Sequence, residues 1–348
     1  MPGRTPWWHP HAFAARRSHL EARARITKAV RGWFEAADFA EVETPALQLS
    51  PGLEPHLNAF RTEIQDPFGA GRRPLYLHTS PEFAMKKLLV AGVPRLYQLA
   101  RVFRNGERAP THHPEFTMLE WYRTEPDWHR LVADCVGLLR AAQASVPAEA
   151  RTPAGFRWQG STADPAAPWE LLSVTEAFHR HAGIDIEPVL DDVPAFAAAA
   201  ARIGIVARPQ DRWDDIFFRI FLDRIEPQLG IGAPTVLHGY PAGMAALARL
   251  DPADPRFAQR FEVYVCGLEL ANAFVELTDP VEQRRRFVAD MDLKQSLYGE
   301  RYPIDEDFLA ALAHGMPDSA GIALGFDRLV MLATGAERIE DVLWAPVA

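Results

Sequence analysis

Apolar residues recur at helical spacing over residues 18–37 and then give way to an alternating pattern. The apolar positions of this stretch are Leu20, Ile26, Val30, Trp33 and Phe34. They fall on one face of a helix with 3.6 residues per turn. The segment "FAEVETPAL" that follows alternates between apolar and polar residues up to Pro45. The pattern therefore predicts a long helix followed by a strand.

The segment "LYLHTSPEFAMKKLLVAG" predicts the reverse order, a strand followed by a helix. Ser80 is a favourable N-cap, Pro81 suits the first helical position, and Gly92 is a typical C-terminal stop. This interpretation places Glu82 in the first turn of the helix.

Residues 97–104 and 115–123 predict two strands joined by the polar loop "NGERAPTHHP", which should form an antiparallel hairpin. In the second strand, a period of two puts four residues on one face: Phe116, Met118, Glu120 and Tyr122. An aromatic ring, a carboxylate and a phenol together suit a pocket better than water or core. Arg104 on the neighbouring strand strengthens this interpretation.

The rest of the chain predicts an α+β fold. Helical patterns fill an insertion at about residues 150–230, for which we expect no chemistry of its own. Strand patterns resume in "APTVLHGYP", "RFEVYV" and "LELANAFVEL", and a helix spans about 280–297. We therefore expect a mainly antiparallel sheet flanked by helices, in one domain over residues 1–348.

Two glutamates lie close together if Cys266 and Gly267 form a two-residue turn. Glu262 would then face Ala271, and Glu262 and Glu269 would lie diagonally on one face. Two carboxylates at this separation repel each other unless a cation joins them, and hard oxygen ligands suit Mg²⁺ that arrives with a nucleotide.

Strict alternation would turn Asn272 and Glu276 to the opposite face of the same strand. For all four polar residues to serve one site, a bulge near Ala271 is required.

A third candidate segment is "GIALGFDRLVML". Small residues at Gly321, Ala323 and Gly325 would let a ligand approach the strand backbone closely. Arg328 would follow in the first turn of a helix.

Composition narrows the class of protein. The chain has 348 residues, is 48% hydrophobic and carries a formal net charge of −9, which argues against a general nucleic-acid coat. No apolar run of about 18 residues and no signal peptide are present, so we expect a cytoplasmic protein that does not enter a membrane. Cys135 and Cys266 lack the spacing of a zinc site or a disulfide framework.

Basic residues are nevertheless concentrated in two places, the first helix and the run at 284–286. In the helix they are Arg16, Arg17, Arg23, Arg25, Lys28 and Arg31. A solvated helix face is the first interpretation, and a docking patch for an acidic partner is the alternative.

Together these segments resemble the catalytic domain of class II aminoacyl-tRNA synthetases of the lysyl branch. "FAEVETPAL" is similar to motif 1, "FRNGE" with "HHPEFTMLEWY" to motif 2, and "GIALGFDR" to motif 3. "TSPEFAMKKLL" and "ELANAFVELTDPVEQRRRF" resemble segments typical of that branch. The resemblance extends over residues 18–346 and implies an antiparallel sheet that binds ATP and an amino acid and forms an aminoacyl-adenylate.

The resemblance also implies roles for individual residues. Arg104 would hold the α-phosphate and the amino acid's carboxylate, and Arg328 would hold the γ-phosphate end; these are the two implied catalytic residues. The other implied nucleotide-binding residues are Asn105, Glu107, His112, His113, Phe116, Glu269, Leu270 and Gly325. The implied amino-acid-binding residues are Ser80, Glu82, Glu120, Tyr122, Asn272, Glu276 and Ala323. Glu262 and Glu269 would hold Mg²⁺.

Several features are more similar to the elongation factor P lysine ligases, a family of truncated paralogues. The first motif begins about twenty residues from Met1, which leaves no room for an N-terminal anticodon-binding OB-fold. Ala323 stands where lysyl-tRNA synthetases usually have glycine. That family activates lysine, preferably (R)-β-lysine, and transfers it to a lysine side chain of elongation factor P. It further implies a homodimer through motif 1 and no stable binding of tRNA or DNA.

Motif 2 departs from its usual form, because Gly106 replaces a glutamate and Glu107 follows one place later. Two alternatives therefore stay open. One is a free-standing enzyme that lysylates tRNA, and the other is a non-catalytic regulatory paralogue that binds lysine or nucleotide.

Overall fold

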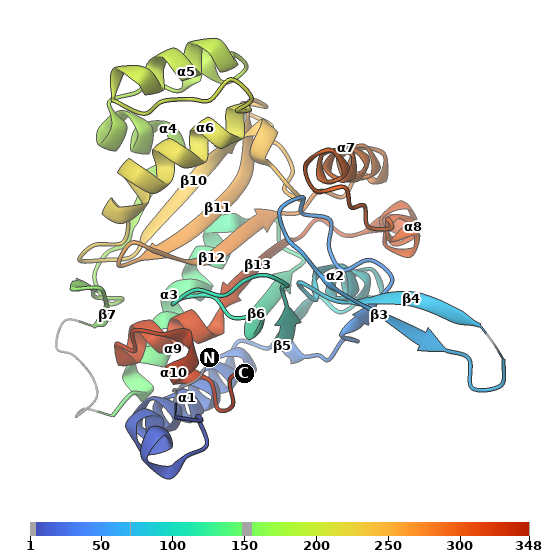
Figure 1. Cartoon of the computed structure of the whole chain (residues 1–348), viewed down its shortest axis with the longest axis vertical. Coiled ribbons are helices and arrows are strands. Elements are labelled where there is room, and N and C mark those ends of the chain that lie inside the picture. Colours follow the sequence, from blue (N-terminus) through green and yellow to red (C-terminus); the bar gives the residue numbers. More distant parts are fainter. Residues whose placement is uncertain (1–4, 70, 148–154, 348) are drawn as a thin grey trace.

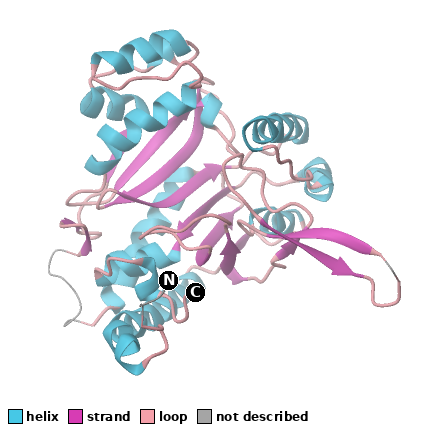
Figure 2. Ribbon diagram, viewed as in Figure 1, coloured by secondary structure: helices cyan, strands magenta, loops and turns pink. Residues whose placement is uncertain are grey.

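A mixed sheet of eight strands forms the centre of the molecule (Figures 1 and 2). The computed structural model describes residues 5–69, 71–147 and 155–347. Along the sheet the strand order is β1-β5-β6-β13-β12-β11-β10-β9, antiparallel except for the two outermost pairs, β1 with β5 and β9 with β10. The strands are β1 Ala40–Glu41, β5 Arg95–Phe103, β6 Glu115–Arg123, β9 Glu170–Ser173, β10 Thr235–Pro241, β11 Phe257–Val265, β12 Leu268–Val275 and β13 Ala320–Gly325. The prediction of an α+β fold with a mainly antiparallel sheet is confirmed.

The first helix, α1 (Pro10–Ala36), starts eight residues before the predicted position. Proline fits the first turn of a helix because its missing N–H has no partner there in any case. The strand predicted after it is short. Only Ala40–Glu41 pairs with β5, in parallel, and one further bond joins the Val42 N–H to the Tyr97 carbonyl before the chain turns at Pro45.

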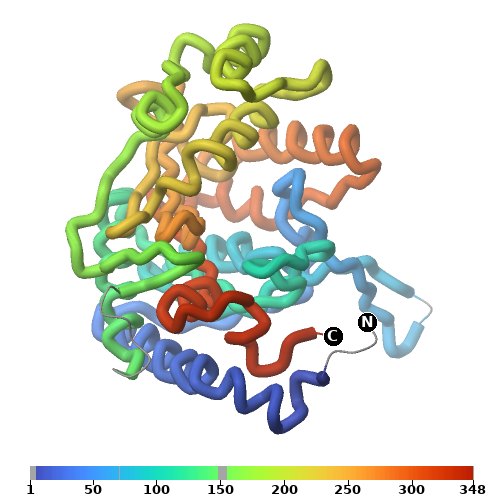
Figure 3. The backbone as a smooth tube through the Cα atoms, turned by 60° about the vertical axis from the view of Figure 1, so that its left-hand side comes forward, coloured from blue at the N-terminus to red at the C-terminus, as the bar shows by residue number. Residues whose placement is uncertain are grey.

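Three helices cover one face of the sheet: α1, α3 (Trp128–Ser145) and α9 (Phe326–Thr334). Their apolar side chains form one buried cluster with the inward residues of the strands, including Leu119 and Trp121 of β6. Figure 3 shows α1 along the base of the molecule beside the C-terminal segment, which contains the short helix α10 (Ile339–Val342).

A second cluster lies around α2 (Glu82–Val90), α7 (Pro280–Tyr298) and α8 (Glu306–Gly315). Next to it, a small sheet of β2 (Leu47–Gln48), β4 (Arg72–Leu77) and β3 (Phe60–Gln65) projects from the body of the molecule (Figure 1).

The insertion is only partly helical, which corrects the prediction for residues 150–230. Its helices are α4 Val174–Ala177, α5 Val193–Arg202 and α6 Trp213–Ile220, joined by short π and 3-10 turns. Before them lie the hairpin of β7 (Phe156–Trp158) and β8 (Ser161–Ala163) and strand β9, which belongs to the main sheet. The predicted start at about 150 lies outside the described residues. The helices enclose a core of their own, to which β10 and β11 contribute (Figure 1).

Within the described ranges, no helix is both long enough and apolar enough to cross a lipid bilayer.

Candidate active site

A cavity of about 470 Å³ opens on the face of the sheet opposite α1, α3 and α9. Strands β6, β12 and β13, the start of α2 and the loop between β5 and β6 supply most of its lining. Sixteen of the eighteen residues implied by the sequence line it: Ser80, Glu82, Arg104, Glu107, His112, His113, Phe116, Glu120, Tyr122, Glu269, Leu270, Asn272, Glu276, Ala323, Gly325 and Arg328. The other two, Asn105 and Glu262, are not part of this lining.

The alternation predicted for β6 is confirmed. Phe116, Met118, Glu120 and Tyr122 line the cavity, whereas Leu119 and Trp121 belong to the core beneath the sheet. The predicted hairpin is also present, because β5 and β6 pair in antiparallel register.

Glu120 lies fully buried at one end of the cavity. Its carboxylate accepts hydrogen bonds from the Ser80 hydroxyl at 2.6 Å and the Tyr122 hydroxyl at 2.9 Å. Burial, together with the negative charge of Glu82, raises the pKa of Glu120 to about 8. The Ser80 hydroxyl also accepts the backbone N–H of Glu82 at 3.0 Å, although α2 begins at Glu82 and not at the predicted Pro81.

Lys86 lies between two further carboxylates of this acidic end. Its ammonium contacts Glu82, one helical turn before it, and lies 2.6 Å from Glu276 Oε2. Burial raises the pKa of Glu276, and the Lys86 ammonium opposes this shift. Glu276 Oε1 is buried and has no hydrogen-bond partner within the described ranges. The acidic end thus offers three carboxyl groups and one internal cation, which leaves capacity to bind a substrate ammonium group.

The other end of the cavity is basic. Arg328, in the first turn of α9, donates to the Glu269 carbonyl at 2.7 Å and to His112 Nε2 at 2.9 Å. Burial and the charges of Arg328 and Arg104 lower the pKa of His112 to about 4. His112 is therefore neutral at pH 7. Its Nε2 accepts a hydrogen bond from Arg328 and so orients the guanidinium.

Arg104 follows β5 and faces the cavity. Its guanidinium carbon lies 5.3 Å from the centre of the Phe116 ring, and its Nε has no hydrogen-bond partner among the residues described. Glu107 Oε1 lies 3.9 Å from Arg104 Nη1, and Glu107 also lines the cavity. Gly106 adopts a φ of +83°, which bends the loop at this point. Asn105 is exposed, and the structure does not bring it to the cavity.

A bulge in β12 brings the polar residues of that strand to the cavity. Val265 lies opposite Leu268 across the predicted turn, and Tyr264 lies opposite Glu269, but Val263 lies opposite Ala271. Leu270 is therefore an extra residue. Glu262 lies opposite Asn272, and the prediction that it would face Ala271 is wrong by one position.

Downstream of the bulge the alternation is reversed, so that Asn272, Phe274 and Glu276 all line the cavity. The bulge that the sequence analysis required near Ala271 is thus confirmed.

Glu262 and Glu269 lie on adjacent strands at the basic end. Glu262 accepts from Arg260 Nη2 at 2.6 Å and from the hydroxyls of Tyr240 and Tyr264, each at 2.5 Å. Burial and the charge of Glu262 raise the pKa of Glu269 to about 7. A pair of oxygen ligands whose charges repel each other fits Mg²⁺. The described residues contain no group of three His, Cys, Asp or Glu side chains placed for a metal, so phosphate oxygens would have to complete the ligand set.

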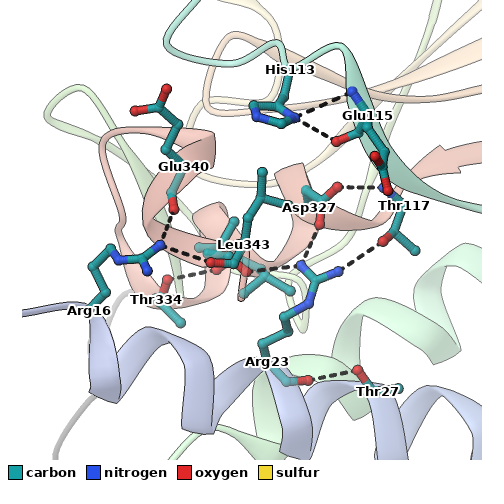
Figure 4. Close-up of polar contacts among 12 residues, drawn as sticks. Arg16, Arg23, Thr27, His113, Glu115, Thr117, Asp327, Thr334, Glu340 and Leu343 are labelled. Atoms are coloured by element: carbon teal, nitrogen blue, oxygen red, sulfur yellow. Dashed lines mark hydrogen bonds and ion pairs between the residues drawn. The ribbon is translucent and has the colours of Figure 1, made fainter. Parts of the chain in front are cut away.

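A buried network fixes the position of α9 and therefore of Arg328 (Figure 4). The Asp327 carboxylate accepts from Arg23 of α1 and from the backbone N–H of Thr117 in β6, the latter at 2.6 Å. Arg16 of α1 donates to the carbonyls of Glu340 and Leu343 at 2.6 and 2.9 Å. Both arginines are buried, so for them the interpretation as a solvated helix face or docking patch is wrong.

His113 also has a structural contact beside the cavity (Figure 4). Its Nδ1 lies 2.6 Å from the Glu115 carbonyl, and its Nε2 accepts the backbone N–H of Val347 at 3.2 Å. His113 thereby ties the C-terminal segment to the loop of motif 2.

Among the lining or supporting residues that were not identified from the sequence are Glu54, Lys86, Phe218 and Arg260. The spacing of Lys86 four residues after Glu82 was an available signal for an ion pair. Arg260 shares a strand face with Glu262 by the period of two. Glu54 lies in an irregular loop and Phe218 in the insertion, and no sequence pattern places either of them here.

The chain belongs to the family of class II tRNA synthetases, because the family model described as "tRNA synthetases class II (D, K and N)" matches residues 12–347 of its sequence. Among individual proteins, the chain is 42% identical over 338 residues to the elongation factor P--(R)-beta-lysine ligase of Sodalis glossinidius, with 97% of this chain and 96% of that protein aligned. It is 41% identical to the ligase of the same name from Erwinia tasmaniensis, over 97% of each chain. It is 39% identical to that of Haemophilus influenzae strain Rd, over 97% of this chain and 96% of the relative.

Proposed function

We propose that this protein is an ATP-dependent ligase that activates lysine, preferably (R)-β-lysine, as an aminoacyl-adenylate and transfers it to a lysine side chain of elongation factor P. The relatives that match over almost their whole length carry this activity in their names. Their identity of 41–42% over 97% of this chain favours the ligase over a tRNA-lysylating enzyme.

One observation carries the proposal: a single cavity holds a buried acidic end and a basic end. Glu82, Glu120 and Glu276 at the acidic end suit a substrate with two ammonium groups. Arg104 and Arg328 at the basic end suit its carboxylate and the phosphates of ATP. A non-catalytic paralogue would not need both phosphate-binding arginines in place.

Activation requires the carboxylate of the amino acid to attack the α-phosphorus of ATP, and both groups are anionic. Arg104 is placed to hold the carboxylate and the α-phosphate together, and Arg328 to hold the γ-phosphate end. No general base is needed because the nucleophile is already ionised. Glu262 and Glu269 would hold Mg²⁺, which neutralises phosphate charge during the displacement.

Other residues position the two substrates. Phe116 offers a ring for adenine, although Arg104 already lies over it. The Asn272 side-chain oxygen accepts a hydrogen bond from Arg260 Nε at 3.2 Å, which fixes the orientation of the amide. The amide N–H groups are then available to donate to the carboxylate of the amino acid. Ala323 lies between Asn272 and Glu120 across the strand pairs, beside the amino-acid end.

In the second step the acceptor amine attacks the carbonyl carbon of the adenylate. A C–N bond forms, the C–O bond to phosphate breaks, and AMP leaves with the electron pair, while the amine, which attacks in its neutral form, releases its proton to water. An isopeptide-type amide on elongation factor P results.

We also propose a homodimer through α1 and β1 and no stable binding of tRNA. The acidic net charge of −9 supports the second point, since phosphate backbones bind basic surfaces.

The test is transfer of labelled (R)-β-lysine in the presence of ATP, with elongation factor P and total tRNA offered side by side. We expect label on the protein alone. Label on tRNA alone would replace the proposal by the tRNA-lysylating alternative, and absence of ATP–pyrophosphate exchange with either lysine isomer would favour the non-catalytic paralogue.

A further inference from the structure

A second cavity, of about 220 Å³, adjoins the active-site cavity. We call it the annex. It lies between the insertion, which supplies Asp214 and Phe218 of α6, and helix α7. Six residues line both cavities: Glu54, His56, Phe218, Ala246, Leu247 and Arg260. The insertion therefore contributes lining residues, Phe218 to both cavities and Asp214 to the annex.

The annex is open to solvent and shares part of its lining with the active-site cavity. Its rim residues His56, Phe218, Gly243 and Ala246 are exposed. Its inner wall is apolar and buried, and includes Leu53, Met244, Leu247 and Phe287. This lining suits an aliphatic chain that enters from solvent.

The charged groups of the annex are mostly acidic. Glu54, Asp214 and Asp290 line it, of which Asp214 is already paired with Arg212, and the Arg260 of the lining is held by Glu262 and the Met244 carbonyl. Burial lowers the pKa of His56, so this imidazole adds no positive charge at neutral pH. The lining therefore favours a positively charged occupant.

Two polar side chains of the annex lack partners within the described ranges. Gln283, on the first turns of α7, is 1% exposed, and neither its amide nitrogen nor its amide oxygen makes a hydrogen bond. Glu54 Oε2, at the junction of the two cavities, is buried and also unpaired. Buried polar groups without partners cost stability, and such groups beside an active site indicate a ligand that satisfies them.

We propose that the annex receives the acceptor, as the alkyl-ammonium side chain of a protein lysine that reaches the adenylate between α6 and α7. Glu54, Asp290 and Gln283 bind the amine end along this path, and the apolar wall packs against its methylene groups. This inference rests on the proposed function, because it supplies the entry route for the acceptor of the second step.

Gly243 permits a test that leaves the active site untouched. It lines only the annex, is exposed, and a Cβ atom there meets nothing within 4 Å. The variant Gly243→Trp should fill the rim, and Gly243→Ser is the matched control. Three reactions are compared: ATP–pyrophosphate exchange, adenylate capture by hydroxylamine, and transfer of labelled (R)-β-lysine to elongation factor P or to the probe Nα-acetyl-lysine methylamide.

We expect Gly243→Trp to keep exchange and hydroxamate formation within about twofold of wild type while transfer to both lysine acceptors falls at least tenfold. Transfer at the wild-type rate would overturn the proposal. A parallel loss of exchange would also overturn it, because the annex would then belong to activation.

The probe separates this inference from the proposed function. If wild-type protein fails to label elongation factor P, the proposed acceptor is wrong, and the effect of Gly243→Trp on the probe still decides the role of the annex.

Gln283→Leu provides a second measurement. We expect it to raise KM for the acceptor at least fivefold without lowering the thermal midpoint, since it removes an unpaired buried amide. A lower midpoint with unchanged KM would assign Gln283 a structural role and contradict the proposal.

Discussion

The Lys86 ammonium lies 2.6 Å from Glu276 Oε2, and neither side chain is more than 1% exposed. Lys86 also pairs with Glu82, so one buried cation serves two carboxylates. Loss of the positive charge of Lys86 would leave the carboxylates of Glu82 and Glu276 buried without an ion-pair partner.

Lys86→Met should therefore destabilise the protein by about 3–5 kcal/mol, the usual cost of breaking a buried ion pair. Lys87→Met is the matched control: Lys87 is 27% exposed and pairs with the buried Asp305 and the exposed Asp307, so a smaller loss of about 1 kcal/mol is expected. Urea unfolding of both variants is the measurement. Equal losses would mean that the buried pair contributes no more than the surface pair.

Gly321 faces Tyr122 so closely that a Cβ atom there would lie 2.2 Å from its ring and 2.6 Å from Glu276 Oε1. Gly321→Ala should displace both side chains, at a cost of about 1–3 kcal/mol in stability, and raise KM for lysine. Gly32→Ala is the control, because a Cβ atom at that helical position meets nothing within 4 Å. Thermal unfolding measures the stability of both variants, and ATP–pyrophosphate exchange measures their KM for lysine. An unchanged KM in Gly321→Ala would show that this contact relaxes without consequence.

The raised pKa of Glu120, about 8 against an ordinary value of 4.5, makes stability depend on pH. The folded protein retains a proton that the unfolded chain has lost, so this contribution is complete below pH 4.5 and disappears as pH rises toward 8. Glu120→Gln cannot ionise. Above pH 8 it should be more stable than wild type by up to about 5 kcal/mol, and near pH 5 the two should be similar. Denaturant unfolding across this range is the check, and a pH-independent difference would contradict the assignment.

Arg104→Ala should lose at least about 100-fold in ATP–pyrophosphate exchange, roughly 3 kcal/mol of transition-state stabilisation. Arg101→Ala, at an exposed position of β5, should stay close to wild type. A near-wild-type rate for Arg104→Ala would mean that the basic end of the cavity does not bind the reacting groups.

Ala323 places a methyl group beside the amino-acid end, opposite Asn272 and Glu120. Ala323→Gly should shift the preference between α-lysine and (R)-β-lysine toward the α-isomer by about 1–3 kcal/mol in relative kcat/KM. Parallel activation assays with both isomers measure this ratio. An unchanged ratio would place the selectivity elsewhere in the cavity.

The regular parts of the site could be predicted from the sequence. The period of two in β6 was sufficient to put Phe116, Glu120 and Tyr122 on the cavity side, because an antiparallel strand with one core face has little freedom of register. Arg328 followed from a strand that passes directly into a helix. In both cases local geometry determines where the side chain points.

Other parts depend on contacts that no local pattern encodes. The position of the bulge at Leu270 was inferred only from the need to unite four polar residues, and the partner of Glu262 was off by one residue. Glu54 reaches the site through an irregular loop and Phe218 through the packing of the insertion. Arg16 and Arg23 resembled surface charges because their buried partners lie about 300 residues further along the chain.

The extra residue in β12, Leu270, reverses which alternate residues of that strand face the cavity. Up to Glu269 the odd-numbered residues of β12 face the cavity, and from Asn272 onward the even-numbered residues face it. A deletion of Leu270 alone would remove the bulge but keep Ala271 opposite Val263 and Asn272 opposite Glu262, so Asn272, Phe274 and Glu276 would still face the cavity. The bulge thus lets Glu269 and Asn272, which lie an odd number of positions apart, share one wall of the cavity, an arrangement that strict alternation would not allow.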